Sequence, residues 1–170
     1  MRAQLSAIEA DISALEIEAI VNAANEPLLM GGGVDGAIRS KAGPEMETEL
    51  REIGWCDTGE ALLTKGYRLP ARFVIHTVAP IWQDDPGDLR LLSACYRNAL
   101  AVAKAHGISE IAFPCLGTGA FGWPADLAAE TAFGAVTKVL DTQNSISRLV
   151  FCCFTAADRS RYEKLISASS

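Results

Sequence analysis

Two glycine-rich segments of this sequence have the composition of loops that bind phosphate groups. The first is Gly31–Gly36, read Gly-Gly-Gly-Val-Asp-Gly, and the second is Gly117–Gly122, read Gly-Thr-Gly-Ala-Phe-Gly. Glycine lets a backbone approach a ligand closely, and successive main-chain amides can then converge on an anion. The second segment contains no Lys or Arg, so amides would be its main neutralising groups. Glycine content alone fits a pair of tight turns equally well.

Polar side chains flank the first of these segments. Asn22 and Asn25 follow the apolar pair Ile20-Val21, and carboxamides both donate and accept hydrogen bonds, which suits ribose hydroxyls. Either asparagine could instead bond a neighbouring loop backbone. Asp35 follows the glycines, where an Asp commonly caps a helix, and its carboxylate could also orient or deprotonate a water that attacks an ester. The two roles of Asp35 can coexist.

Other motifs with known chemistry are weak or absent. Gly117, Gly119 and Gly122 formally match the dinucleotide fingerprint, but that motif belongs to the first strand-to-helix turn of a sheet and this match lies late in the chain. The sequence has neither a P-loop motif nor the G-x-S-x-G of serine hydrolases. No cluster of candidate metal ligands accompanies His76 or His106, so we expect both to be structural and no metal to be bound.

Composition predicts one soluble domain spanning residues 1–170 of the 170-residue chain. No apolar run approaches a membrane span, and the amino terminus does not resemble a secretory signal, so we expect a cytoplasmic protein. The five cysteines include no C-x-x-C pair, which predicts reduced, mostly buried thiols. The net charge of −6 argues against nucleic acid as a partner. A domain of this size can act as a monomer.

Short apolar runs alternate with helical patterns along the chain, which predicts an α/β fold with a largely parallel sheet covered on both faces. Apolar residues repeat at three- and four-residue intervals across 89–103 and 127–139, as in helices that pack on a sheet. The expected strands are Arg2–Glu9, Ala19–Asn22, Glu60–Thr64, Phe73–Ala79, Glu110–Pro114 and Arg148–Phe154, and the shorter helices are Gly36–Ala42, Glu45–Ile53 and Ala157–Ser167. Both glycine-rich segments then follow strands, so they should line one cleft at the carboxyl ends of the strands.

Taken together, five segments in order along almost the whole chain closely resemble the macrodomain family, and most closely its MacroD type. They are Asp11-Ile12, the Val21–Asn25 stretch Val-Asn-Ala-Ala-Asn, the Gly32–Ile38 stretch Gly-Gly-Val-Asp-Gly-Ala-Ile, the Val74–Pro80 stretch Val-Ile-His-Thr-Val-Ala-Pro, and the Thr118–Pro124 stretch Thr-Gly-Ala-Phe-Gly-Trp-Pro. The resemblance implies a three-layer α/β/α sandwich with a mixed, mostly parallel six-stranded sheet. It also implies a cleft that holds ADP-ribose.

The same resemblance assigns roles to individual residues. Asp11 would accept a hydrogen bond from the adenine amino group, and Ile12 would offer a backbone amide beside it. Phe154 would pack on the adenine ring, although composition alone also allows it to be a core residue. Asn25 and Asp35 would face the distal ribose and carry turnover, with Asp35 positioning or activating a water. Main-chain amides would hold the diphosphate at Gly33, Val34, Gly119, Ala120, Phe121 and Gly122.

The implied activity is hydrolysis, without cofactor, metal or covalent intermediate, of an ester linkage to ADP-ribose. The substrates would be proteins mono-ADP-ribosylated on Glu or Asp, or O-acetyl-ADP-ribose. The alternative is a reader module that binds ADP-ribose without turning it over. This sequence departs from the family pattern at four positions, namely Ala10, Met30, Arg39 and Gly117, which stand where relatives often have glycine, glycine, histidine and serine. We expect the loss of the serine hydroxyl to remove a phosphate contact worth about 1 kcal/mol.

Overall fold

The computed structural model describes residues 2–170, which form six strands and the helices that cover them. The strands are β1 (Gln4–Glu9), β2 (Ala19–Ala23), β3 (Ala61–Lys65), β4 (Phe73–Thr77), β5 (Glu110–Phe113) and β6 (Arg148–Cys153). The helices are η1 (Ile12–Ala14, a 3-10 turn), α1 (Gly33–Ala42), α2 (Pro44–Ile53), α3 (Pro86–Ala105), α4 (Ala125–Thr142) and α5 (Ala156–Ser169).

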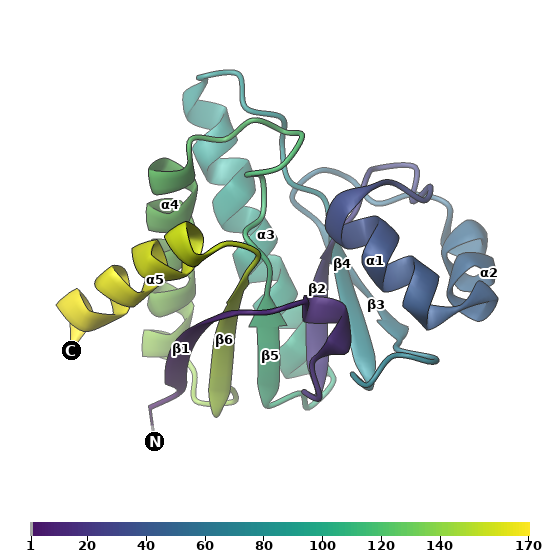
Figure 1. The fold of residues 1–170 in the computed structure, drawn as a ribbon, viewed down its shortest axis with the longest axis horizontal. Coiled ribbons are helices and arrows are strands. Elements are labelled where there is room, and N and C mark those ends of the chain that lie inside the picture. The colour runs from purple at the N-terminus through teal and green to yellow at the C-terminus, as the bar shows by residue number, and fades with distance from the viewer. Residues whose placement is uncertain (1) are drawn as a thin grey trace.

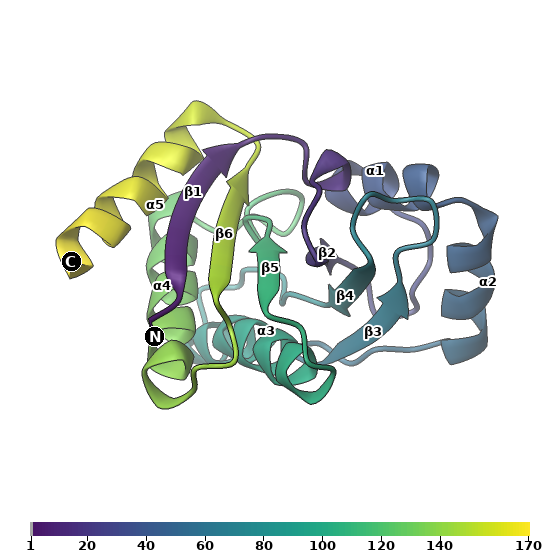
Figure 2. The same ribbon diagram turned by 90° about the horizontal axis from the view of Figure 1, so that it is seen from below.

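The strands form one mixed sheet in the order β1-β6-β5-β2-β4-β3. Every neighbouring pair is parallel except β3 and β4, which are antiparallel. Helices α1 and α2 lie on one side of the sheet, and α3, α4 and α5 lie on the other (Figures 1 and 2). This arrangement confirms the predicted three-layer α/β/α sandwich.

Side-chain alternation along the strands divides the core between the two faces. Leu149, Phe151 and Cys153 of β6 belong to the cluster packed with α3, α4 and α5. Val150 and Cys152 of the same strand belong to the cluster packed with η1, α1 and α2. Because successive side chains of a strand point to opposite faces, a strand buried on both faces must be apolar at nearly every position. This explains the continuous apolar runs in the sequence.

The switch point at which we expect the ligand crevice lies between β2 and β5. These two strands pair only at Ala19 with Ile111 and at Ile20 with Ala112, so they separate toward their carboxyl ends. The chain leaves β2 for α1 on one face and leaves β5 for α4 on the other (Figure 1). Ligands of open α/β sheets bind at such a switch point. Both glycine-rich segments are the connections that leave these two strands.

The predicted elements are all present, with shifted ends. Helix α1 begins at Gly33 instead of Gly36, β4 ends at Thr77 instead of Ala79, and the short turn η1 was not predicted from the sequence. None of the helices in residues 2–170 has the length and apolar character that a membrane crossing needs. All five cysteines are free, and four of them are buried, as expected.

Candidate functional site

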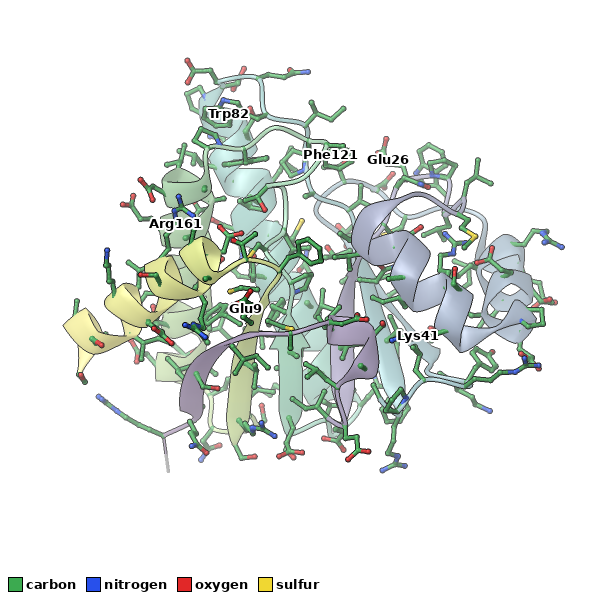
Figure 3. The ribbon with its side chains drawn as sticks, in the orientation of Figure 1. Glu9, Glu26, Lys41, Trp82, Phe121 and Arg161 are labelled. Carbon is green, nitrogen blue, oxygen red and sulfur yellow. The ribbon has the colours of Figure 1, made fainter. Side chains whose placement is uncertain are left out.

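The residues predicted to bind a ligand gather at the carboxyl ends of the parallel strands. Asp11 follows β1, Asn25 follows β2, the second glycine-rich segment follows β5 and Phe154 follows β6. Figure 3 labels Phe121 of the second glycine-rich segment and Glu26 of the connection after β2, and both lie at this end of the sheet. The structure therefore brings together segments that are far apart in the sequence.

The Asp35 carboxylate is buried at the start of α1, with 4% of the residue exposed. Its Oδ2 accepts a hydrogen bond from the Gly31 amide at 2.6 Å, and its Oδ1 accepts one from Asn22 Nδ2 at 2.8 Å. Asp35 is the third residue of the helix and Gly32 occupies the N-cap position, so the N-cap interpretation of Asp35 is wrong. The two bonds fix the carboxylate plane, and Oδ1 keeps a lone pair that can accept from a water.

Asn22 and His76 form a buried pair behind Asp35. They are opposite one another in the parallel ladder of β2 and β4, and both are 0% exposed. Asn22 Nδ2 lies 3.1 Å from His76 Nδ1, and His76 Nε2 lies 2.9 Å from Thr64 Oγ1. Burial, with a smaller effect of the Arg39 charge, lowers the pKa of His76 to about 3. His76 is therefore neutral at physiological pH.

Arg39 is buried in α1 and bonds both Asp35 and the loop that precedes the first glycine-rich segment. Its guanidinium forms two bonds with Glu47, Nε to Oε1 at 2.6 Å and Nη2 to Oε2 at 3.0 Å. Nη2 also donates to the Leu28 carbonyl at 2.7 Å, and Nη1 lies 3.4 Å from Asp35 Oδ2. Glu47 of α2 therefore neutralises the buried positive charge of Arg39.

The Asn25 side chain is hydrogen-bonded to the loop that follows it. Its Nδ2 donates to the Leu29 carbonyl at 2.7 Å, and its Oδ1 accepts from the Leu29 amide at 2.8 Å. A Cβ added at Gly31 would lie 3.7 Å from Asn25 Nδ2 and 3.5 Å from Asp35 Oδ2. Asn25 and Asp35 thus approach the same point of the loop, and any side chain at Gly31 would project toward both.

Asp11 sits at the far end of the crevice, where its carboxylate caps η1. Oδ1 accepts from the Ser13 amide at 2.9 Å and from the Ser13 hydroxyl at 2.6 Å, and Oδ2 lies 3.1 Å from Lys41 Nζ. The Ser13 hydroxyl, with a further contribution from Lys41, lowers the pKa of Asp11 below its usual range. An ionised carboxylate with a partly exposed Oδ2 can accept a hydrogen bond from an amino group.

The Phe154 ring projects into solvent directly after β6. The residue is 85% exposed, so the interpretation of Phe154 as a core residue is wrong. An aromatic ring held at the end of a buried strand offers a face on which a planar base can stack.

The second glycine-rich segment presents unused main-chain donors. Among the hydrogen bonds of residues 2–170, the amide of Gly122 donates to Gly119, while the amides of Gly119, Ala120 and Phe121 have no partner. Across the crevice, the amides of Gly33 and Val34 lie in the first turn of α1, where no intrahelical acceptor exists. Of the six residues expected to hold a diphosphate, five thus have an amide available.

Position 117 requires glycine because of its backbone conformation and because of the neighbouring Trp123 side chain. It has φ +86°, and a Cβ there would lie 2.6 Å from Cδ1 of Trp123. Trp123 is 4% exposed, and its Nε1 donates to the Pro80 carbonyl at 2.8 Å, so the indole has little room to move. A serine cannot occupy this position without rearrangement of the loop.

The sequence raised Asn22 only as a possible ribose contact, and it did not identify His76 or Glu47 as parts of this site. The contact of His76 with Asn22 depends on the register of β2 and β4, and the contact of Glu47 with Arg39 depends on the packing of α2 against α1. The position of Asn22 at the end of an apolar strand was the one sequence feature that indicated a role for it in the site. No group of three or more His, Cys, Asp or Glu side chains in residues 2–170 is arranged to hold a metal.

Comparison with known proteins gives a consistent result. The family model described as "Macro domain" matches residues 21–132. The chain is 50% identical over 165 residues to the macro domain-containing protein CT2219 of Chlorobaculum tepidum, covering 96% of both chains. It is 43% identical over 167 residues to the ADP-ribose glycohydrolase MACROD2 of Xenopus laevis, covering 96% of this chain and 40% of that protein.

The fold is also similar to that of a solved macrodomain structure. A point mutant of the Oceanobacillus iheyensis macrodomain, determined with ADPR, superposes with a TM-score of 0.94 at 37% identity. The match covers 99% of this chain and 94% of the other. The similarity therefore includes both glycine-rich segments and all six strands.

Replacing Gly117 by Ser tests the packing argument for the second loop. We expect Gly117→Ser to lower the free energy of unfolding by about 2–4 kcal/mol, because it combines a strained positive φ with an overlap against Trp123. Chemical denaturation measures this change. The matched control is Gly119→Ser in the same loop, where a Cβ would meet nothing within 4 Å. A Gly117→Ser protein as stable as the control would contradict the argument.

The buried neutral imidazole predicts a specific dependence of stability on pH. Unfolding returns the pKa of His76 from about 3 to its ordinary value of 6.5, so between these values the unfolded state binds the extra proton. Stability should therefore fall as the pH falls from about 6 to 4, with His76 contributing up to about 1.4 kcal/mol per pH unit. Denaturation at several pH values, compared with His76→Asn, measures this contribution. Parallel pH profiles for the two proteins would refute it.

Proposed function

The chain belongs to the macro domain family, and on that premise we propose that it binds ADP-ribose and hydrolyses ester linkages to its terminal ribose. The substrates are proteins mono-ADP-ribosylated on Glu or Asp, or O-acetyl-ADP-ribose. The observation that carries the proposal is the Asp35 carboxylate, which is buried in the first glycine-rich segment and hydrogen-bonded on both oxygens. The glycohydrolase name of the MACROD2 relative supports the same assignment.

The proposed ligand extends along the crevice from η1 to α1. Adenine lies beside Asp11, with the backbone amide of Ile12 and the exposed ring of Phe154 as its other contacts. The diphosphate lies between the first turn of α1 and the amides of Gly119, Ala120 and Phe121. The distal ribose then reaches Asn25 and Asp35. Main-chain donors suit a diphosphate because they are fixed dipoles in a protein whose net charge is −6.

In the proposed reaction, Asp35 accepts a hydrogen bond from a water and thereby orients its oxygen toward the electrophilic carbon of the ester. The water oxygen bonds to that carbon while the bond to the leaving oxygen breaks, and the water proton passes to the leaving group through Asp35. The products are ADP-ribose and a carboxylic acid, which releases its proton to water. The Asn22 and Gly31 bonds hold the carboxylate in one orientation, which reduces the reorganisation needed at each turnover.

A reader module that binds ADP-ribose without hydrolysis is the second candidate. It is favoured by the Asn25 carboxamide, because both its oxygen and its nitrogen are hydrogen-bonded to the Leu29 main chain. A binding module needs the amide cradle and the adenine contacts but no fixed carboxylate. Tight binding without product release by the wild-type protein would support this alternative.

Removing the Asp35 carboxylate separates the two candidates. We expect Asp35→Ala to slow release of ADP-ribose from a protein mono-ADP-ribosylated on glutamate by about 10²-fold or more. Affinity for free ADP-ribose, measured by calorimetry on the same samples, should change much less. Asp126→Ala serves as control, because Asp126 is an exposed acid at the start of α4. Hydrolysis at the wild-type rate in Asp35→Ala would exclude the proposed role of Asp35.

The adenine contact can be tested at Phe154. We expect Phe154→Ala to weaken ADP-ribose binding by about 1–3 kcal/mol, because stacking of a base on an aromatic ring contributes this much. Tyr67→Ala is the control, since Tyr67 is an exposed aromatic between β3 and β4, at the opposite edge of the sheet. Equal affinities for the two variants would mean that the Phe154 ring does not contact the base.

A further inference from the structure

His76 holds a position from which it can control Asp35 without touching the ligand. Asn22, His76 and Thr64 come from three adjacent strands, β2, β4 and β3, and all are at most 2% exposed. Asn22 joins this group to Asp35 on α1 by the 2.8 Å bond from Nδ2 to Oδ1. A continuous line of hydrogen bonds thus runs from Thr64 in β3 to the proposed catalytic carboxylate of Asp35.

The hydrogen-bond pattern assigns the protons along this line. Asn22 Nδ2 has two hydrogens, and it faces both Asp35 Oδ1 and His76 Nδ1. His76 Nδ1 must then be an acceptor, which places the ring proton on Nε2. Nε2 donates to Thr64 Oγ1, and the Thr64 hydroxyl donates in turn to the Lys65 carbonyl at 3.0 Å. Every donor along the line therefore meets an acceptor.

Other arrangements of the same groups conflict with this geometry. If Nδ1 carried the proton, two N–H donors of His76 and Asn22 would face one another. If the Asn22 carboxamide were turned by 180°, its oxygen would face the Asp35 carboxylate, and two acceptors would meet. The present orientation leaves Asn22 Oδ1 buried without a hydrogen-bond partner in residues 2–170. The contacts of the nitrogen, and not those of the oxygen, therefore determine how this side chain lies.

We propose that His76, in its neutral Nε2–H form, is a positioning residue that orients Asn22 and through it fixes the Asp35 carboxylate for water attack. This inference rests on the proposed hydrolase function. His76 acts on the rate and not on affinity, because its only described link to the crevice passes through Asn22 and Asp35 and does not reach the adenine or diphosphate contacts.

Two substitutions of His76 separate positioning from packing. The side-chain amide of Asn can place an oxygen where Nδ1 lies, so His76→Asn retains an acceptor for Asn22. Gln can instead place a group where Nε2 lies, so His76→Gln retains the Thr64 contact and loses the acceptor for Asn22. Both replacements are uncharged amides, and a purely structural role for the histidine would not predict that the smaller residue restores the rate.

We expect His76→Gln to lower kcat for ADP-ribose release by about 10-fold to 10²-fold, as a displaced reacting group does. The Kd for free ADP-ribose should stay within about twofold of wild type, and His76→Asn should recover most of the rate. A His76→Gln protein as fast as wild type would overturn the proposal, as would equal losses in the two variants. Absence of release by the wild-type protein would instead refute the proposed hydrolase function.

NMR on the wild-type protein tests the proton assignment directly. This test requires neither a folded variant nor a measurable rate of hydrolysis. In ¹⁵N-labelled protein, NMR should show His76 protonated on Nε2 and bare on Nδ1 throughout the range from pH 8 to pH 5. The Asn22 side-chain amide protons should exchange slowly with solvent, because both are hydrogen-bonded. A proton on Nδ1, or a His76 ring that titrates in this range, would overturn the proposal.

Discussion

The separation of β2 from β5 is the constraint on which the site depends. Two paired residues on each strand hold the strands together near their amino ends, and beyond them the helices leave on opposite faces. Past this point β2 and β5 no longer pair with one another, so main-chain donors on their facing sides and in the loops that follow are available to a ligand. The two connections that leave these strands are the glycine-rich segments. The crevice and its supply of amides therefore have one topological cause.

The charges around the crevice explain why amides are its main donors. Arg39 and Lys41 are the cations nearest to the first loop in sequence, and each is engaged by acidic partners, Glu47 and Asp35 for the first and Asp11 for the second. A diphosphate therefore meets no unpaired cation from α1. Fixed amide dipoles remain, and they favour an anion without adding a mobile positive charge to a buried site.

Much of this arrangement was predictable from the sequence, because apolar periodicity and glycine content report local structure. The positions of Phe154 and Asp35 were left open, since exposure and helix starts depend on where the neighbouring elements end. The contacts of Asn22 with His76 were not predictable, because they require the exact pairing of two strands that lie far apart in the chain. Gly117 illustrates the same limit: only the indole of Trp123 above it explains why serine is excluded.

The arrangement behind Asp35 favours hydrolysis over simple recognition. A neutral histidine buried in the sheet lowers stability at acidic pH, and the unpaired Asn22 oxygen adds a desolvation cost. A module that only recognises ADP-ribose would gain nothing from these costs, because in the proposed binding mode adenine and diphosphate contact other residues. A hydrolase would gain a carboxylate held in one orientation, which is what a water nucleophile requires. The energetic cost is thus concentrated at His76 and Asn22, which lie directly behind the carboxylate to which we assign the chemistry.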